Sequence, residues 1–264
     1  ATAPSAYTQA VDTVAPTVGI SDNVTGTANG DVTFTFTFSE AVTGFDASKV
    51  TVAGGTKGAF TATSATVYTL VVTPAASSTT PISVTTSTTG VTDAAGNVAT
   101  APSAYTQAVD TVAPTVSSVV ISATGASGTQ LNAGDVVTVT ATYSENVSGQ
   151  PTTAPTLTIG SETSIAMTAG TTTGNTRTWT YTISSTGTTD TGSISVAGNL
   201  VAGITDTAGN AATGTTPAAT GTFTADTAAP TVSSVVISAT GASGTLLNAG
   251  DVVTVTATYS ENVS

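Results

Sequence analysis

Long internal repeats constrain the architecture of this 264-residue chain more than any other feature of its sequence. The stretch ATAPSAYTQAVDTVAPTV fills residues 1–18 and recurs unchanged at residues 99–116. The stretch at residues 113–148 recurs at residues 229–264 with one substitution. The aspartate of each VDT or ADT triplet therefore marks the same point in successive units, and these marks are Asp12, Asp110 and Asp226.

The marks divide the chain into two complete units and two partial ones. We predict complete repeats at residues 13–110 and 111–226. Residues 1–12 copy the end of a unit, so we interpret them as the last strand of a preceding repeat. Residues 227–264 copy the start of a unit and are expected to form the first strands of a following, incomplete repeat. The simplest interpretation is an excerpt from a longer tandem array.

Each complete unit is expected to be all-β. In the stretch DVTFTFTFSE, Phe34, Phe36 and Phe38 share one face and threonines share the other, which is the alternation of a half-buried strand. Seven short runs bounded by Gly, Asn, Asp and Pro predict an immunoglobulin-like Greek-key β-sandwich, with the units arranged end to end. In the first unit the strands are predicted at residues 16–21, 31–39, 48–53, 58–64, 66–73, 82–87 and 103–109.

The two cores are expected to exchange large and small residues at matching positions. Ala141 is predicted to stand where the first unit has Phe36, and Trp179 where it has Tyr68. A larger ring beside a smaller residue would keep the core volume constant, as close packing requires.

The composition excludes most chemistry. The chain has no Cys and no His, which excludes disulfides, thiolate catalysis, Ser-His triads and zinc sites built on those residues. Lys and Arg together number 3 against 15 acidic residues, for a net charge of −12, so nucleic acid is not an expected partner. No apolar run approaches the ~18 residues of a membrane span, so we expect no membrane insertion. Such acidity favours cations instead.

The acidic residues are predicted to gather at one pole of each sandwich. Greek-key topology brings the entering linker, the end of the second strand and the turn after the sixth strand to the same end. Carboxylates placed together repel one another, and a Ca²⁺ ion, which takes roughly six to eight oxygen ligands, relieves that repulsion. We therefore predict calcium sites at the junctions, with the ligands Asp12, Glu40, Asp93 and Asn97; Asp110, Glu145, Asp206 and Asn210; and Asp226 and Glu261 in the partial unit.

The residues alone leave two points open. Each aspartate could simply be a turn residue that accepts hydrogen bonds from nearby backbone N–H groups. Asn97 and Asn210 could supply an amide oxygen or shape the turn, and Asp31 and Asp135 at the opposite pole are weaker candidate ligands.

Three motifs resemble a known family. The stretches VDTVAPTV, FSEAVTGFDASKVTVAGG and GVTDAAGNVAT resemble the bacterial Ig-like repeats of giant secreted surface proteins, including biofilm-associated and repeats-in-toxin adhesins exported by type I secretion. The second unit keeps TYSENV, GITDTAGN and ADTAAPTV around a longer middle. This resemblance implies calcium at domain junctions, a stiff stalk and a location outside the bacterial cell.

We therefore expect a structural stalk or fibre segment of a cell-surface protein, acting in adhesion, biofilm or surface filaments. Its partners are neighbouring repeats, with lateral or end-to-end copies left open. A self-assembling surface layer, sheath or filament subunit is the first alternative, and a carbohydrate- or ice-binding module is the second. No enzyme activity is expected, because the one imaginable carboxylate pair, Glu162 and Asp190, has no counterpart in the first unit and lies in predicted loops.

Overall fold

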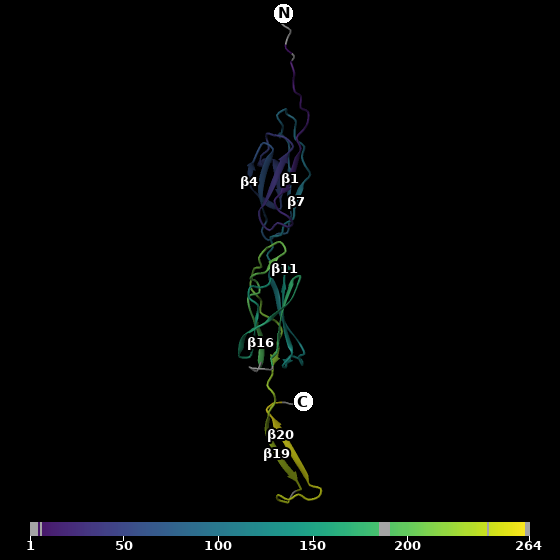
Figure 1. Cartoon of the computed structure of the whole chain (residues 1–264), viewed down its shortest axis with the longest axis vertical. Coiled ribbons are helices and arrows are strands. Elements are labelled where there is room, and N and C mark those ends of the chain that lie inside the picture. The colour runs from purple at the N-terminus through teal and green to yellow at the C-terminus, as the bar shows by residue number, and fades with distance from the viewer. Residues whose placement is uncertain (1–4, 6, 185–190, 242, 262–264) are drawn as a thin grey trace.

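The computed structural model describes residues 5, 7–184, 191–241 and 243–261. It is elongated, and two β-sandwiches and a C-terminal hairpin follow one another along its long axis (Figure 1). One hydrophobic cluster lies within residues 18–109 and a separate one within residues 116–225. We call the structures around them the first and the second sandwich. Across the described part of the chain, no helix has the length and apolarity needed to cross a membrane.

The first sandwich has the sheet order of an immunoglobulin constant-type domain. One sheet runs β1-β2-β5-β4 and the other β3-β6-β7, which corresponds to the ABED and CFG sheets of that fold. Each strand overlaps a range predicted from the sequence, so the predicted sandwich is confirmed. The elements are β1 (Val18–Asp22), β2 (Val32–Phe38), the 3₁₀ helix η1 (Ala47–Lys49), β3 (Val50–Ala53), β4 (Gly55–Ala62), β5 (Val67–Pro74), β6 (Ile82–Thr86) and β7 (Tyr105–Gln107).

The second sandwich keeps this plan and adds further short strands. Its first sheet runs β14-β15-β10-β8 and its second β13-β12-β16-β18-β9, while β11 and β17 form a separate two-stranded ladder. The expectation of seven strands was therefore too low here. The strands are β8 (Val116–Thr124), β9 (Gln130–Leu131), β10 (Val136–Tyr143), β11 (Val147–Ser148), β12 (Thr156–Ile159), β13 (Glu162–Ala166), β14 (Thr168–Thr173), β15 (Thr176–Thr182), β16 (Gly192–Ala197), β17 (Thr205–Asp206) and β18 (Thr224–Ala225).

Strand β2 shows why this sequence folds as a sandwich. Val32, Phe34, Phe36 and Phe38 are all buried, and the threonines between them are partly or fully exposed. The phenylalanine rings pack with rings from other strands and loops, for example Phe38 edge-on against Tyr68 at a centroid separation of 5.8 Å. Burying aromatic side chains of this size is the main source of stability in a core without disulfides.

The register corrects one expected correspondence between the two cores. Phe36 lies opposite Tyr68 in the first sandwich, whereas Ala141 lies opposite Arg177 in the second. Trp179 lies opposite Val139, two residues further along, where the first sandwich pairs Phe34 with Leu70. Ala141 thus matches Phe36 as expected, but the residue that takes the place of Tyr68 is Arg177 and not Trp179.

Arg177 is a charged side chain in an apolar core, with only 2% of its surface exposed. Its guanidinium donates to backbone carbonyls, with Nη2 bonded to Val147 and Nε bonded to Gly149 at 2.9 Å. In the first sandwich the Tyr68 hydroxyl donates to the carbonyl of Val42, the equivalent of Val147, at 3.3 Å. Two different side chains therefore hold the same loop, the one that follows the strand-end glutamate. Because buried polar groups are costly when unpaired, this network explains how the core tolerates the charge.

The C-terminal hairpin consists of β19 (Val232–Thr240) and β20 (Val252–Tyr259). It repeats the sequence and the antiparallel pairing of β8 and β10. Ile237 is 70% exposed here, while its counterpart Ile121 is 4% exposed in the core of the second sandwich. The interpretation of residues 227–264 as the first strands of a further repeat stays a prediction.

We predict that replacing Arg177 with leucine destabilises the second sandwich by roughly 2–4 kcal/mol, because each buried carbonyl that loses its donor costs about 1–3 kcal/mol. The matched change Tyr68→Phe removes one neutral hydrogen bond and should cost about 1 kcal/mol. Urea unfolding followed by Trp179 fluorescence measures the first effect, and far-UV circular dichroism measures the second. Arg177→Leu protein as stable as the wild type would contradict this expectation.

Candidate cation sites

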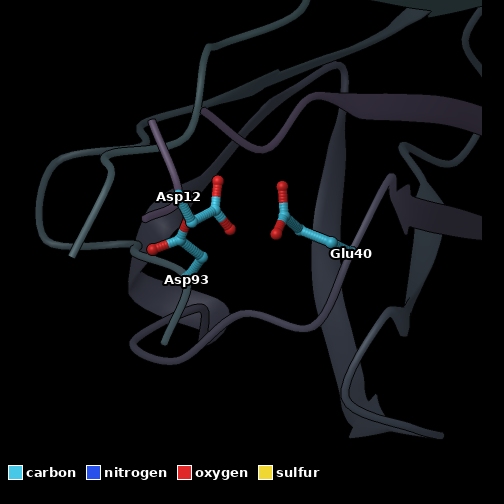
Figure 2. A group of neighbouring side chains, drawn as sticks. All are labelled: Asp12, Glu40 and Asp93. Atoms are coloured by element: carbon cyan, nitrogen blue, oxygen red, sulfur yellow. The ribbon is translucent and has the colours of Figure 1, made fainter. Parts of the chain in front are cut away.

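Three acidic side chains meet at the N-terminal pole of the first sandwich (Figure 2). Asp12 lies in the segment that enters the sandwich, Glu40 lies just after β2, and Asp93 lies in a turn between β6 and β7. One carboxylate oxygen from each residue lies within 4.8 Å of the others. The fold therefore brings together three residues that are up to 81 positions apart in the sequence.

The second sandwich repeats the arrangement. Asp110 lies in the linker from the first sandwich, Glu145 follows β10, and Asp206 ends β17. Their carboxylate oxygens also lie within 4.8 Å of one another. We call the groups Asp12–Glu40–Asp93 and Asp110–Glu145–Asp206 the first and second acidic triads.

Local hydrogen bonds explain why these positions carry aspartate. In the linkers, Oδ1 of Asp12 accepts from the N–H of Val14, and Oδ1 of Asp110 accepts from the N–H of Val112, both at 3.0 Å. This is the turn-forming role that short acidic side chains play without any metal. Asp12 and Asp110 therefore form turns and also belong to the acidic triads.

The asparagine four residues after each turn aspartate organises the turn. Asn97 donates its backbone N–H to Oδ1 of Asp93 at 2.8 Å and its side-chain amide to Oδ2 at 2.7 Å. The amide nitrogen also contacts the linker carbonyl of Asp12 at 3.3 Å. Asn210 makes the same bonds to Asp206, and its amide reaches the carbonyl of the linker Asp110 at 2.9 Å. Of the two roles left open for these asparagines, the contacts support the shaping of the turn.

Electrostatics distinguish the members of each triad. Desolvation, followed by the charges of Asp12 and Asp93, raises the pKa of Glu40 above its ordinary value of 4.5. Desolvation, then Asp110 and Asp206, raises the pKa of Glu145 in the same way. The side-chain hydrogen bond from Asn97 is the largest effect on Asp93 and lowers its pKa below 3.8. In both glutamates, burial and the neighbouring charges together favour the protonated form.

The other predicted acids lie elsewhere. Asp226 and Glu261 are not joined by a third acidic residue in the part of the chain that the structure describes. Asp31 accepts a hydrogen bond from the Thr73 hydroxyl at 2.7 Å, and Asp135 accepts one from the N–H of Asn132 at 2.7 Å. Neither belongs to a described triad. Glu162 begins β13 and does not lie in the expected loop, and Asp190 lies outside the described residues.

Residues 12–109 match the model of a family described as a bacterial Ig-like domain. The match begins at the linker aspartate of the first triad and contains the whole of that triad. No curated protein matches the chain. Among solved structures, the crystal structure of the I9–I11 tandem from titin is similar, with 9% identity and a TM-score of 0.23. The alignment covers 80% of this chain and 65% of the titin chain, so the chain spans about two thirds of that tandem's length.

The raised glutamate pKa values predict how metal-free protein responds to pH. Because the folded state holds these protons more tightly than the unfolded state does, the contribution of the two glutamates to stability is greatest below the ordinary value of 4.5 and is lost as pH rises through their raised pKa values. Asp93 has the opposite sign, and its contribution is lost as pH falls below 3.8.

We therefore expect Glu40→Gln and Glu145→Gln to raise the melting temperature of chelator-treated protein at pH 7 and to flatten its decline between pH 4.5 and 7. Scanning calorimetry across this range provides the measurement. Asp31→Asn is the control, since this acid lies outside both triads. A wild-type melting temperature that rises with pH over the same interval would contradict the expectation.

Proposed function

We propose that this chain is a structural stalk or fibre segment of a bacterial cell-surface protein, and that a calcium ion at each acidic triad stiffens the connection between successive sandwiches. One observation carries the proposal. Each triad combines an acid from the linker with two acids from separate segments of the sandwich that follows, and the arrangement occurs twice at equivalent places. An ion bound there would join the linker to the sandwich.

The geometry of the triads fits a hard divalent cation. Calcium binds oxygen ligands at about 2.3–2.6 Å, so two oxygens on one ion lie no more than about 5 Å apart. The oxygens within each triad meet that limit, at 4.8 Å or less. Carboxylates suit calcium rather than a soft metal, and the chain has no Cys or His to attract one. Asp93 and Asp206 would serve as the anchored ligands, because they are 5% and 3% exposed and their turns hold them in place.

The benefit of such an ion is mechanical. Contacts between consecutive domains of one chain are usually small, so relative motion is the default. An ion that holds the linker aspartate against two segments of the next sandwich removes freedom at that point. Outside a bacterium, where calcium is abundant, a row of such junctions would keep the far end of the parent protein away from the cell.

We expect calcium to raise the melting temperature of the chain, because a ligand that binds only the folded state stabilises it by about 2.7 kcal/mol at 100 times its dissociation constant. Calorimetry with calcium and with a chelator tests this, and small-angle scattering should show a longer maximum dimension with calcium. Asp206→Asn and Asp93→Asn should each remove one binding event. Melting and scattering curves that do not respond to calcium or chelator would refute the calcium role.

The second candidate, a self-assembling surface layer, sheath or filament subunit, is favoured by one edge of the second sandwich. Strand β14 ends its sheet, all six of its residues are exposed, and it carries neither a charged residue nor a proline. Natural sheets usually protect such an edge, because its unpaired backbone groups can pair with another chain. The carbohydrate- or ice-binding alternative lacks comparable support, since the rings of Phe34, Phe36 and Trp179 are buried.

Lateral assembly through β14 predicts concentration-dependent sedimentation. A charge at the exposed Thr171 should block pairing along this edge, so Thr171→Lys should keep the chain monomeric at concentrations where the wild type associates. Thr61→Lys on the outer strand β4 of the first sandwich is the matched control. Equal sedimentation of the wild type and Thr171→Lys at every concentration would rule out this edge.

A further inference from the structure

Both sandwiches hold Asp110, the linker residue of the second triad. Its backbone N–H donates to the carbonyl of Ala28 in the first sandwich at 2.9 Å. Its own carbonyl accepts from Nδ2 of Asn210 in the second sandwich at 2.9 Å. The backbone of this candidate ligand is therefore fixed on one side by the preceding sandwich and on the other by the following one.

The next residue, Thr111, fastens the linker more firmly to the first sandwich. Its N–H donates to the carbonyl of Ser78 at 3.0 Å, and its hydroxyl donates to the carbonyl of Ala75 at 2.7 Å. The same hydroxyl accepts from the N–H of Ser78 at 2.9 Å. These partners lie in the loop between β5 and β6, so Thr111 joins the linker to a part of the first sandwich remote in sequence.

A second approach between the sandwiches lies beside this linker. A Cβ atom added to Gly209, in the turn that carries Asp206, would lie 3.1 Å from Nδ2 of Asn29 in the first sandwich. The equivalent Gly96 in the first sandwich has the same left-handed backbone, with φ of +96° against +95°, and nothing within 4 Å. The turn of the second triad thus faces the first sandwich.

The segment around Asp12 provides a reference in which the described residues show fewer hydrogen bonds to the linker. Asp12 is exposed, and residues 7–11 before it form no strand. Its carbonyl accepts from Asn97 at a longer distance of 3.3 Å. Among the described residues, neither its N–H nor the side chain of Thr13, the counterpart of Thr111, has a hydrogen-bond partner.

We propose that Thr111 is a positioning residue through which the fold of the first sandwich sets the cation affinity of the second triad. The inference rests on the proposed cation-binding function. At the second triad these bonds order the linker before an ion arrives. Fixing the backbone of one residue corresponds to about a tenfold change in an equilibrium constant, so the second triad should bind calcium about tenfold more tightly with the Thr111 hydrogen bonds than without them.

The coupling has to act in both directions. If docking of Asp110 on the first sandwich favours binding, then a bound ion must favour docking by the same factor. Calcium at the second triad should therefore protect backbone N–H groups of the first sandwich that hold the linker, although these groups do not belong to the triad.

Calorimetric titration of the 264-residue chain with calcium chloride tests the proposal, with one triad disabled at a time. Asp12→Asn leaves the second triad to be measured, and Asp110→Asn leaves the first. In the Asp12→Asn chain, Thr111→Val keeps the side-chain shape, removes the hydroxyl and should weaken calcium binding about tenfold. In the Asp110→Asn chain, the matched change Thr13→Val should alter the affinity less than about twofold, because no hydrogen bond of its side chain is lost.

Three outcomes separate the explanations. Unchanged affinity in the Thr111→Val chain would overturn the coupling and leave the stalk function standing. A lower melting temperature without a change in affinity would make Thr111 merely structural and would also overturn it. Loss of calcium binding from both triads of the wild-type chain would instead overturn the proposed function.

Hydrogen exchange supplies a measurement that does not depend on the folding of the Thr111 variant. In the Asp12→Asn chain, calcium should slow exchange at the N–H groups of Asp110 and Thr111 and at Ser78, which bonds to the Thr111 hydroxyl. Protection confined to residues 112–226, with no change at these three groups, would contradict the inference.

Discussion

Repulsion among three carboxylates held within 4.8 Å is the interaction on which the behaviour of the junctions depends. The Greek-key fold creates it, because the sheet order places the ends of distant strands at the pole where the linker enters. In a chain in which only 7% of residues are charged, these two groups bring like charges together at equivalent places and contribute to the raised pKa values of Glu40 and Glu145. The same fold that builds a stable sandwich thus also brings like charges together where the linker enters it.

Much of the fold and of the acidic triads could be predicted from the sequence. Alternation of Phe and Thr in β2 has a period that only a strand satisfies, and the repeats allow one unit to guide the interpretation of the next. The meeting of the acidic residues at one pole could be predicted from the Greek-key topology. Arg177 was missed because an arginine at a core position breaks the apolar alternation, and its partners are backbone carbonyls that carry no sequence signal. Thr111 was missed for the same reason, since it bonds the backbone of residues 75 and 78.

The two sandwiches show how one loop can be supported by different chemistry. A tyrosine hydroxyl and an arginine guanidinium both donate to the loop after the strand-end glutamate, and in each sandwich this loop leads away from the acidic triad. The larger volume of Phe36 accompanies the tyrosine, and the smaller Ala141 leaves room for the guanidinium. The position of the glutamate is therefore retained while the core beneath it changes.

Near-identity of β8–β10 and β19–β20 has a consequence for how the chain reaches its fold. In an unfolded chain, β15 meets two copies of its partner strand, since β20 has the sequence of β10. When the whole chain refolds at once, β15 can pair with the nearby copy or with the distant one. Pairing with the wrong copy traps two repeats together. Synthesis from the N-terminus removes the ambiguity, because β10 and β15 leave the ribosome before β20 exists.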